Sequence, residues 1–487
     1  MIRFTSTFMI LVLSVSYTFS QQVQKTAIDN VIDIGSRREL FVDYYLIDRM
    51  QGAELRLHEP QDEGPVFYFD NPWEGQFSGY CTIIKEDSLF RAYYRGIPTV
   101  GNDGNKNEVT CIAESKDGIN WEKPNLGIFE FNGTKSNNII LANAAPVTHN
   151  FSPFLDTKPG ITKTQKYKAL GGTSKSGLIA FASADGILWE KMRDEPVITD
   201  GKFDSQNVAF WSESEQCYVS YFRIWTKTGY SGFRSVGRAT SNDFLNWTAT
   251  TPMTFGDSPM QHLYTNQTHP YYRAPHIYIA IAARFMPGRQ VVSEDNAQKL
   301  NVNPKYFKDC SDAVFMTSRG GNEYDRTFMQ GFINPGIGLQ NWVSRTNYPA
   351  LNVVQTGPYE MSVYVNQDYA QPTAHLHRYS MRLDGFASVY APFEGGQVLT
   401  KPFKFKGQKL SLNFSTSAAG SVIVEITNKD GQPINRFTLG DSNELIGNEI
   451  DKSVTWNSQN NLNELAGKTI RLRFFIKDAH IYSFQFY

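Results

Sequence analysis

Three carboxylic acids lie beside or inside predicted strands, at positions suited to acid–base chemistry. Glu74 lies in Pro72-Trp-Glu-Gly75, Asp204 precedes the strand-like residues 205–211, and Glu360 lies inside an apolar run. A carboxylate in such a run is costly unless it is paired or faces water. One acid kept neutral by burial can donate a proton while another stays ionised. We therefore predict that the three are catalytic, although Glu74 and Asp204 could equally serve turns.

Several cationic, polar and aromatic residues recur at matching places near these acids. Arg95 and Arg223 each end a second strand after two aromatic residues, and Arg345 lies in an aromatic-rich stretch. Guanidinium groups bind carboxylate or sulfate in bidentate fashion. They could equally pair with the acids of the site. The predicted substrate-binding residues are Arg95, His149, Asn207, Arg223, Tyr264 and Arg345.

Other chemistries have no specific signal in the sequence. The chain contains no H-E-x-x-H, phosphate loop, G-x-S-x-G elbow or Cys/His cluster, so no metal and no cofactor is expected. Four scattered cysteines include Cys81 and Cys111 in neighbouring predicted strands, where either a disulfide or free thiols would fit. The formal net charge of −1 argues against nucleic acid as a partner.

A repeated phrase indicates the elements that must position these residues. Ser115-Lys-Asp-Gly-Ile-Asn-Trp121 recurs from Ser183 and from Ser241, with a degenerate copy from Ser318. Each copy follows a strand-like run, and Asp-Gly favours tight turns. Strand-only repeats with a period near 60 residues are typical of propeller blades, whereas coincidental turns in a β-sandwich are the alternative.

Five segments share a polar lead-in, an apolar strand, a turn and an aromatic strand, which predicts an all-β, five-bladed β-propeller over residues 31–385. Residues 31–58 are expected to close the ring. Inner strands of all blades start near one end of the axis, so the lead-ins should converge in one pocket. From residue 390 to 487 apolar and polar residues alternate, which predicts a β-sandwich.

The first twenty residues have the composition of an export signal. Arg3 precedes the apolar core Phe8–Leu13, and small residues precede Gln21. That core is too short to span a bilayer, and no later segment reads as a membrane span. We therefore expect residues 1–20 to be a signal peptide and the protein to be exported, either periplasmic or secreted.

The turn phrases, strands such as Phe90-Arg-Ala-Tyr-Tyr-Arg95 and the appended sandwich resemble those of five-bladed β-propeller glycoside hydrolases, the invertase and arabinanase group. The resemblance implies three carboxylates from different blades and an oligosaccharide substrate. The usual N-D-P-N, R-D-P and E-C signatures are absent at the matching blade starts. The segment most similar to R-D-P is Phe203-Asp-Ser-Gln-Asn207. The expected function is an exported glycosidase on acidic or sulfated oligosaccharides. The alternatives are a lyase or dehydratase on uronate-containing oligosaccharides, with Tyr or His as base, and a non-catalytic carbohydrate-binding propeller.

Overall fold

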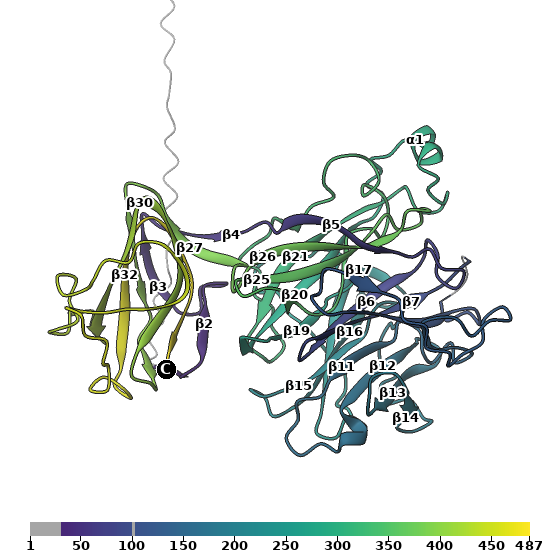
Figure 1. Cartoon of the computed structure of the whole chain (residues 1–487), viewed down its shortest axis with the longest axis horizontal. Helices are drawn as coiled ribbons and strands as arrows, with labels where there is room; N and C mark the ends of the chain where they lie inside the picture. The colour runs from purple at the N-terminus through teal and green to yellow at the C-terminus, as the bar shows by residue number, and fades with distance from the viewer. Residues whose placement is uncertain (1–30, 100–102) are drawn as a thin grey trace, which may run out of the picture.

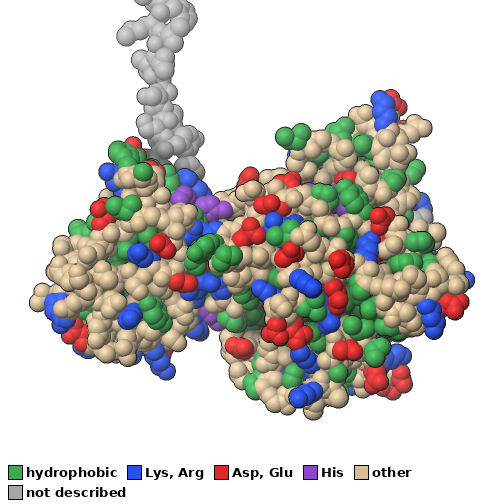
Figure 2. Space-filling model, in the orientation of Figure 1, with side chains coloured by type: hydrophobic (Ala, Val, Ile, Leu, Met, Phe, Trp, Pro, Cys, Tyr) green, Lys and Arg blue, Asp and Glu red, His purple; other side chains and the backbone are tan. Residues whose placement is uncertain are grey.

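The computed structural model describes residues 31–99 and 103–487, which form two β-rich bodies (Figure 1). The predicted signal peptide lies outside the described residues. The larger body is a five-bladed propeller, and the smaller one carries the C-terminus. Acidic and basic side chains are interspersed over the face drawn in Figure 2. In the part of the chain that is described, no helix is both long and apolar enough to span a membrane.

Five separate sheets confirm the predicted blade count. The first blade contains β6 (Gly79–Glu86), β7 (Leu89–Gly96), β8 (Val109–Ser115), β9 (Trp121–Glu122) and β10 (Ile139–Leu141). The second contains β11 (Ser152–Leu155), β12 (Tyr167–Thr173), β13 (Gly177–Ser183) and β14 (Glu190–Lys191). The third contains β15 (Val208–Ser212), β16 (Cys217–Lys227), β17 (Ser231–Ser241) and β18 (Thr251–Pro252).

The fourth blade contains β19 (Thr268–Tyr271), β20 (Ala274–Met286), β21 (Cys310–Ser318) and β22 (Gly331–Ile333). The fifth contains β23 (Tyr348–Pro349), β24 (Val354–Gln355), β25 (Glu360–Gln367), β26 (His375–Arg382) and, from far upstream, β5 (Gln61–Tyr68). Helix is confined to η1 (Lys163–Gln165) and α1 (Glu294–Lys299) within the described ranges.

The ring is closed by an N-terminal strand, but not by the segment expected to do so. Strand β5 pairs with β26 as the outer strand of the last blade. Strands β1 (Ile32–Gly35), β2 (Arg38–Leu40), β3 (Ile47–Gln51) and β4 (Glu54–Leu57) instead pair within the second body. The expectation for residues 31–58 was therefore wrong. The sequence of an apolar strand does not indicate which sheet the strand pairs with.

The repeated phrase forms the turn between the third and outer strands of the first three blades. In the first copy the Asp117 carboxylate accepts the backbone N–H of Ile119 and of Asn120, both at 2.8 Å. The indole N–H of Trp121 then donates to the Gly118 carbonyl at 3.0 Å. The copies from Ser183 and Ser241 repeat both contacts. The repeated sequence thus forms the same set of hydrogen bonds in each of the three blades, and these bonds fix the turn that leads to the outer strand.

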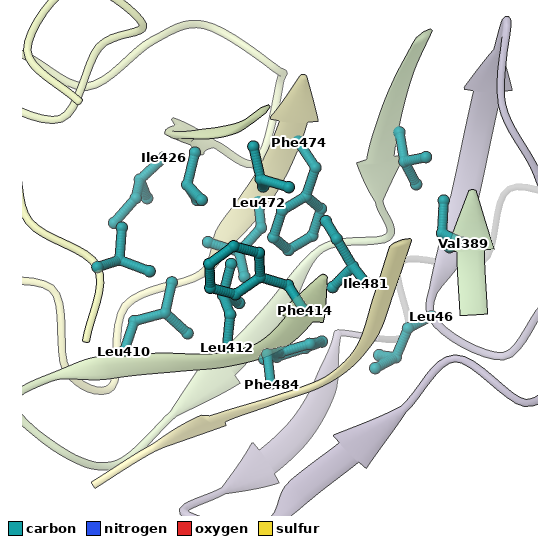
Figure 3. Close-up of a cluster of buried hydrophobic side chains, with 14 of the residues drawn as sticks. Leu46, Val389, Leu410, Leu412, Phe414, Ile426, Leu472, Phe474, Ile481 and Phe484 are labelled. Atoms are coloured by element: carbon teal, nitrogen blue, oxygen red, sulfur yellow. The ribbon is translucent and has the colours of Figure 1, made fainter. Parts of the chain in front are cut away.

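The second body is one ten-stranded sheet that curls around an apolar core. Besides β1–β4 it contains β27 (Ala387–Ala391), β28 (Gly396–Thr400), β29 (Phe403–Phe405), β30 (Leu410–Asn428), β31 (Asn448–Ser453) and β32 (Ile470–Phe486). Alternate residues such as Leu412, Phe414 and Phe474 point into this core (Figure 3). This arrangement is compatible with the predicted sandwich.

Buried charges join the two bodies. Glu39 is fully buried and accepts from His276 and Arg319 of the propeller, each at 2.9 Å. Burial favours the neutral acid, but these partners outweigh it and lower the pKa of Glu39. The four cysteines, including Cys81 and Cys111, are free thiols.

Candidate functional site

Residues that precede or begin the inner strands surround a small pocket at one end of the propeller axis, together with residues at or after the ends of the second strands. It has a volume of about 70 Å³. Amide contacts link neighbouring blades near the starts of their inner strands, because the Gln267 side chain donates to Gln206 and to the Pro349 carbonyl, both at 2.6 Å. The pocket is lined by Phe77, Tyr80, Arg95, Ile97, Asp103, Glu108, Asp204, Tyr264, Tyr306, Arg345 and Tyr369.

A larger cavity of about 470 Å³ lies at the opposite ends of the inner strands. Its lining is mostly apolar, and its histidine is already engaged: His269 Nδ1 contacts the Gln267 carbonyl, and Nε2 accepts from Val353 N–H. Burial lowers the pKa of His269 to about 4, so it stays neutral. We place the candidate site in the smaller pocket because the charged groups gather there.

Tyr264 is the centre of the charged cluster. The guanidinium carbons of Arg223, Arg234 and Arg345 lie 4.4, 5.3 and 5.7 Å from the centre of its ring. Burial alone would raise the pKa of Tyr264, but Arg345, Arg223 and Arg234 together lower it below its usual value. The neighbouring Tyr80 shows the opposite balance, since burial raises its pKa well above the usual range. One phenol is thus biased toward ionisation beside another that stays protonated.

Arg95 is held by neutral groups on the other side of the pocket. It donates to the Phe77 carbonyl at 2.7 Å and to the Asn150 side chain at 3.0 Å, and it lies 4.6 Å from the centre of the Tyr80 ring. Behind it, the His149 ring contacts the Glu108 carboxylate at 2.8 Å. Burial opposes ionisation of Glu108, but His149 and Arg95 lower its pKa, so it is an anion.

Asp204 is the one member of the predicted carboxylate trio that lines the pocket. It pairs with Arg223, whose remaining guanidinium nitrogens Nε and Nη1 are buried and have no hydrogen-bond partner among the described residues. The Asp204 side chain is 31% exposed and therefore reachable by a ligand. A buried, unsatisfied guanidinium edge is costly and marks a place where an anion fits.

The other two members of the trio lie elsewhere, so the predicted three-carboxylate constellation is wrong. Glu74 is buried, and it accepts from Tyr94 at 2.6 Å and from Lys123 at 2.7 Å. Glu360 begins β25, which is the second strand of its blade, and it pairs with Arg378 at 2.9 Å. Strand β25 runs from Glu360 toward the pocket. At a rise of about 3.3 Å per residue, the length of this strand puts Glu360 roughly 20 Å away from the pocket.

Some of the predicted binding residues lie at the pocket, and others lie outside it. Arg95, Tyr264 and Arg345 line the pocket, Arg223 contacts Tyr264 and Asp204, and His149 lies behind the lining. Asn207 lies outside the lining, and its amide donates to the Ser205 carbonyl at 3.0 Å, which secures the local loop. Sequence reasoning missed Tyr80, Glu108, Arg234, Tyr306 and Tyr369. Glu108 could have been found, because it directly precedes a predicted strand.

Two lining residues and Asn150, the hydrogen-bond partner of Arg95, have left-handed backbone conformations that side chains disfavour. Tyr80 has φ of 53°, Asn150 of 48° and Arg345 of 62°. Such conformations each cost on the order of 1–2 kcal/mol outside glycine. The fold therefore holds these side chains at the pocket at some cost in stability. No group of three or more potential metal ligands occurs among residues 31–99 and 103–487.

Comparison with known proteins gives similarity of fold only. By sequence, no protein-family model and no curated protein matches the chain. An N-acetylgalactosamine deacetylase from F. plautii is 12% identical, with 69% of this chain and 97% of that one covered and a TM-score of 0.43. An exo-β-1,3-galactanase from Phanerochaete chrysosporium is 12% identical over 85% and 99%, with a TM-score of 0.38. A structure titled glycoside hydrolase is 10% identical over 66% and 92%, with a TM-score of 0.44. All three TM-scores are below 0.5, so the function is inferred from the residues of this chain.

Proposed function

We propose that this protein is an enzyme that acts on the terminal residue of a uronate-bearing oligosaccharide and eliminates an oxygen substituent from it. The reaction class is that of a carbon–oxygen lyase or dehydratase. The observation that carries the proposal is the position of Tyr264 among three guanidinium groups at a small pocket.

The unpaired guanidinium groups support an anionic substrate. Arg95 and Arg345 line the pocket, and Arg223 and Arg234 contact the Tyr264 ring; of these four, only Arg223 forms a salt bridge with a site carboxylate of the described residues. Arg95, Arg234 and Arg345 form no salt bridge within the described ranges, and Glu108 is engaged with His149. A uronate carboxylate or a sulfate group is the kind of ligand that binds such unpaired guanidinium groups in bidentate fashion.

The chemistry follows from these groups. A proton on the carbon next to a carboxylate becomes acidic enough to remove when cations neutralise the charge that develops on the carboxylate oxygens. The Tyr264 phenolate takes that proton, and the electron pair of the C–H bond forms the carbon–carbon double bond. The neighbouring C–O bond breaks, and its oxygen leaves with the bonding pair and takes a proton from Tyr80. Solvent then returns Tyr264 and Tyr80 to their starting protonation states.

The leaving oxygen decides the product. A hydroxyl group on a terminal uronate leaves as water and keeps the oligosaccharide intact, whereas a glycosidic oxygen leaves with the rest of the chain. The small volume of the pocket favours a terminal residue. Hydrolysis needs a protonated carboxylic acid opposite a second carboxylate. Glu74 and Glu360 are outside the pocket. Of the carboxylates that line it, Glu108 is held as an anion, Asp204 pairs with Arg223 and Asp103 is 57% exposed, so none is both buried and free of a cationic partner.

Product analysis tests the proposal directly. The protein is incubated with a panel of oligosaccharides that carry terminal hexuronates, and the products are analysed by mass spectrometry and ultraviolet absorbance. We expect loss of one water, or chain cleavage without water uptake, together with absorbance from a double bond conjugated to the carboxylate. Gain of water would identify a glycosidase instead, and unchanged substrate across the panel with retained binding would identify a carbohydrate-binding propeller. Tyr264→Phe is the matched inactive control.

Export of the protein is a separate part of the proposal. It rests on Arg3, the apolar residues 8–13 and the small residues before Gln21. We expect the mature protein in the periplasm or the medium, with Gln21 at its N-terminus. N-terminal sequencing of protein from fractionated cells checks this, and an intact Met1 terminus on cytoplasmic protein would contradict it.

A further inference from the structure

The third blade carries a hairpin that is longer than its role in the sheet requires. Strands β16 and β17 have eleven residues each, whereas their inner neighbour β15 has five. Arg223 pairs with Val236 in this hairpin, and Trp225 pairs with Arg234 two residues further out. Because side chains alternate along a strand, Trp225 and Arg234 lie on the face that Arg223 turns toward the pocket. The hairpin therefore extends the pocket wall outward by roughly 7 Å.

The contacts of Arg234 place this extension next to Tyr264. Its guanidinium carbon lies 4.6 Å from the centre of the Trp225 ring, 4.8 Å from that of Phe285 and 5.3 Å from that of Tyr264. Its side chain has no hydrogen bond or salt bridge to the described residues. The indole N–H of Trp225 is buried and also lacks an acceptor in the part of the chain that is described. Two donor side chains of this hairpin thus have no partner among those residues.

The tip of the same hairpin exposes aromatic rings. Tyr230 is 51% exposed and Phe233 is 38% exposed. Tyr230 lies 6.0 Å from Trp225 between ring centres, and Phe233 lies 5.0 Å from His262. A pyranose has an apolar C–H face and a polar edge, so it suits a surface of rings beside unpaired donors.

We propose that Trp225, Tyr230, Phe233 and Arg234 form a binding subsite for the second sugar residue of the oligosaccharide. The rings cover one face of that sugar, and Arg234 binds an anionic substituent on it. The position of the subsite rests on the proposed function, because the terminal sugar must occupy the pocket beside Tyr264. The reaction type plays no part in the inference.

Binding measured by calorimetry without turnover tests the subsite. The background is Tyr264→Phe, and the ligands are hexuronate oligosaccharides of one to four residues from several series. We expect a longer ligand to bind more tightly than the monosaccharide. Tyr230→Ala and Trp225→Ala should weaken binding of the longer ligand about tenfold and leave the monosaccharide unchanged, since a desolvated ring contact contributes that order. Arg234→Gln should reduce the preference for a second residue that carries a carboxylate or sulfate.

The outcomes separate this inference from the proposed reaction. Tyr230→Ala removes an exposed ring, so misfolding does not obscure its result, and Tyr359→Ala removes a 70% exposed ring beside Glu360 as the matched control. The subsite would be overturned if the monosaccharide and the longer oligosaccharides bound with equal affinity. It would also be overturned if the variants weakened binding of both kinds of ligand equally. Length-dependent binding that these variants abolish would support the subsite even if the products show hydrolysis. Elimination by wild-type protein with no effect of the variants would overturn the subsite alone.

Discussion

Replacing Arg345 with methionine should move the pH dependence of catalysis, because Arg345 is the largest single influence that lowers the pKa of Tyr264. Its guanidinium carbon lies 5.7 Å from the centre of the Tyr264 ring. At an effective dielectric constant of about 20, two unit charges at that distance interact by about 3 kcal/mol. This corresponds to about two pH units. Methionine keeps an unbranched apolar stem and removes the charged guanidinium group with its N–H donors.

The sign follows from the role of Tyr264 as a base. The phenolate is the active form, so kcat/KM of the wild-type protein should rise with pH through the pKa of Tyr264. Removal of a nearby cation favours the neutral phenol and raises that pKa. The rising limb of the profile in Arg345→Met should therefore move about two pH units toward alkaline values.

The assay is the initial rate of product absorbance on a uronate-terminated oligosaccharide from acidic to alkaline pH. Arg91→Met is the matched control, because it removes a half-buried arginine that pairs with Glu114 away from the pocket. We expect its rising limb to coincide with that of wild type. A rising limb that stays in place in folded Arg345→Met protein would refute the assignment of Tyr264 as the titrating base.

The remaining predictions concern single side chains. Tyr264→Phe should lower kcat by about 10²–10⁴-fold and leave ligand affinity within about threefold, measured by kinetics and calorimetry. Glu360→Gln should leave kcat/KM unchanged, and a large decrease in kcat/KM would show that Glu360 belongs to the site after all. Glu74→Gln should lower the free energy of unfolding by about 1–3 kcal/mol in urea titrations, because Lys123 loses its buried anionic partner. Asp117→Ala should lower it by about 1 kcal/mol through the lost turn hydrogen bonds.

The sequence predicted the propeller because turn chemistry is local. The contacts of Asp117 and Trp121 involve only residues of their own turn, so three copies of the phrase report three copies of one geometry. The convergence of Asp204, Tyr264 and Arg345 was also accessible from sequence. Each precedes an inner strand, and propeller symmetry brings such positions together.

The carboxylate trio could not be predicted in this way. Glu360 lies in an apolar strand, and burial on both faces makes second strands and inner strands alike in sequence. Glu74 precedes an inner strand, as expected of a site residue, but Lys123 and Tyr94 from later in the chain bind it away from the axis. The position of Arg234 depends on how far the β16–β17 hairpin extends beyond the rest of its sheet. That length follows from the pairing of Trp225 with Arg234, which the sequence alone does not show.

Asp204→Asn discriminates between elimination and hydrolysis, because the two mechanisms predict opposite results. In the elimination mechanism Asp204 occupies the Arg223 guanidinium until a substrate carboxylate takes its place. Loss of its charge then frees Arg223, so binding of a uronate ligand should tighten several-fold, an effect of about 1 kcal/mol, and turnover should persist. A glycosidase that uses Asp204 as nucleophile, base or charge stabiliser would lose most of its turnover on the same substitution. Calorimetric affinity and initial rate on one uronate oligosaccharide, with wild type and Asp204→Asn measured side by side, decide between them. Weaker binding together with abolished turnover would refute the competition between Asp204 and the substrate carboxylate for Arg223.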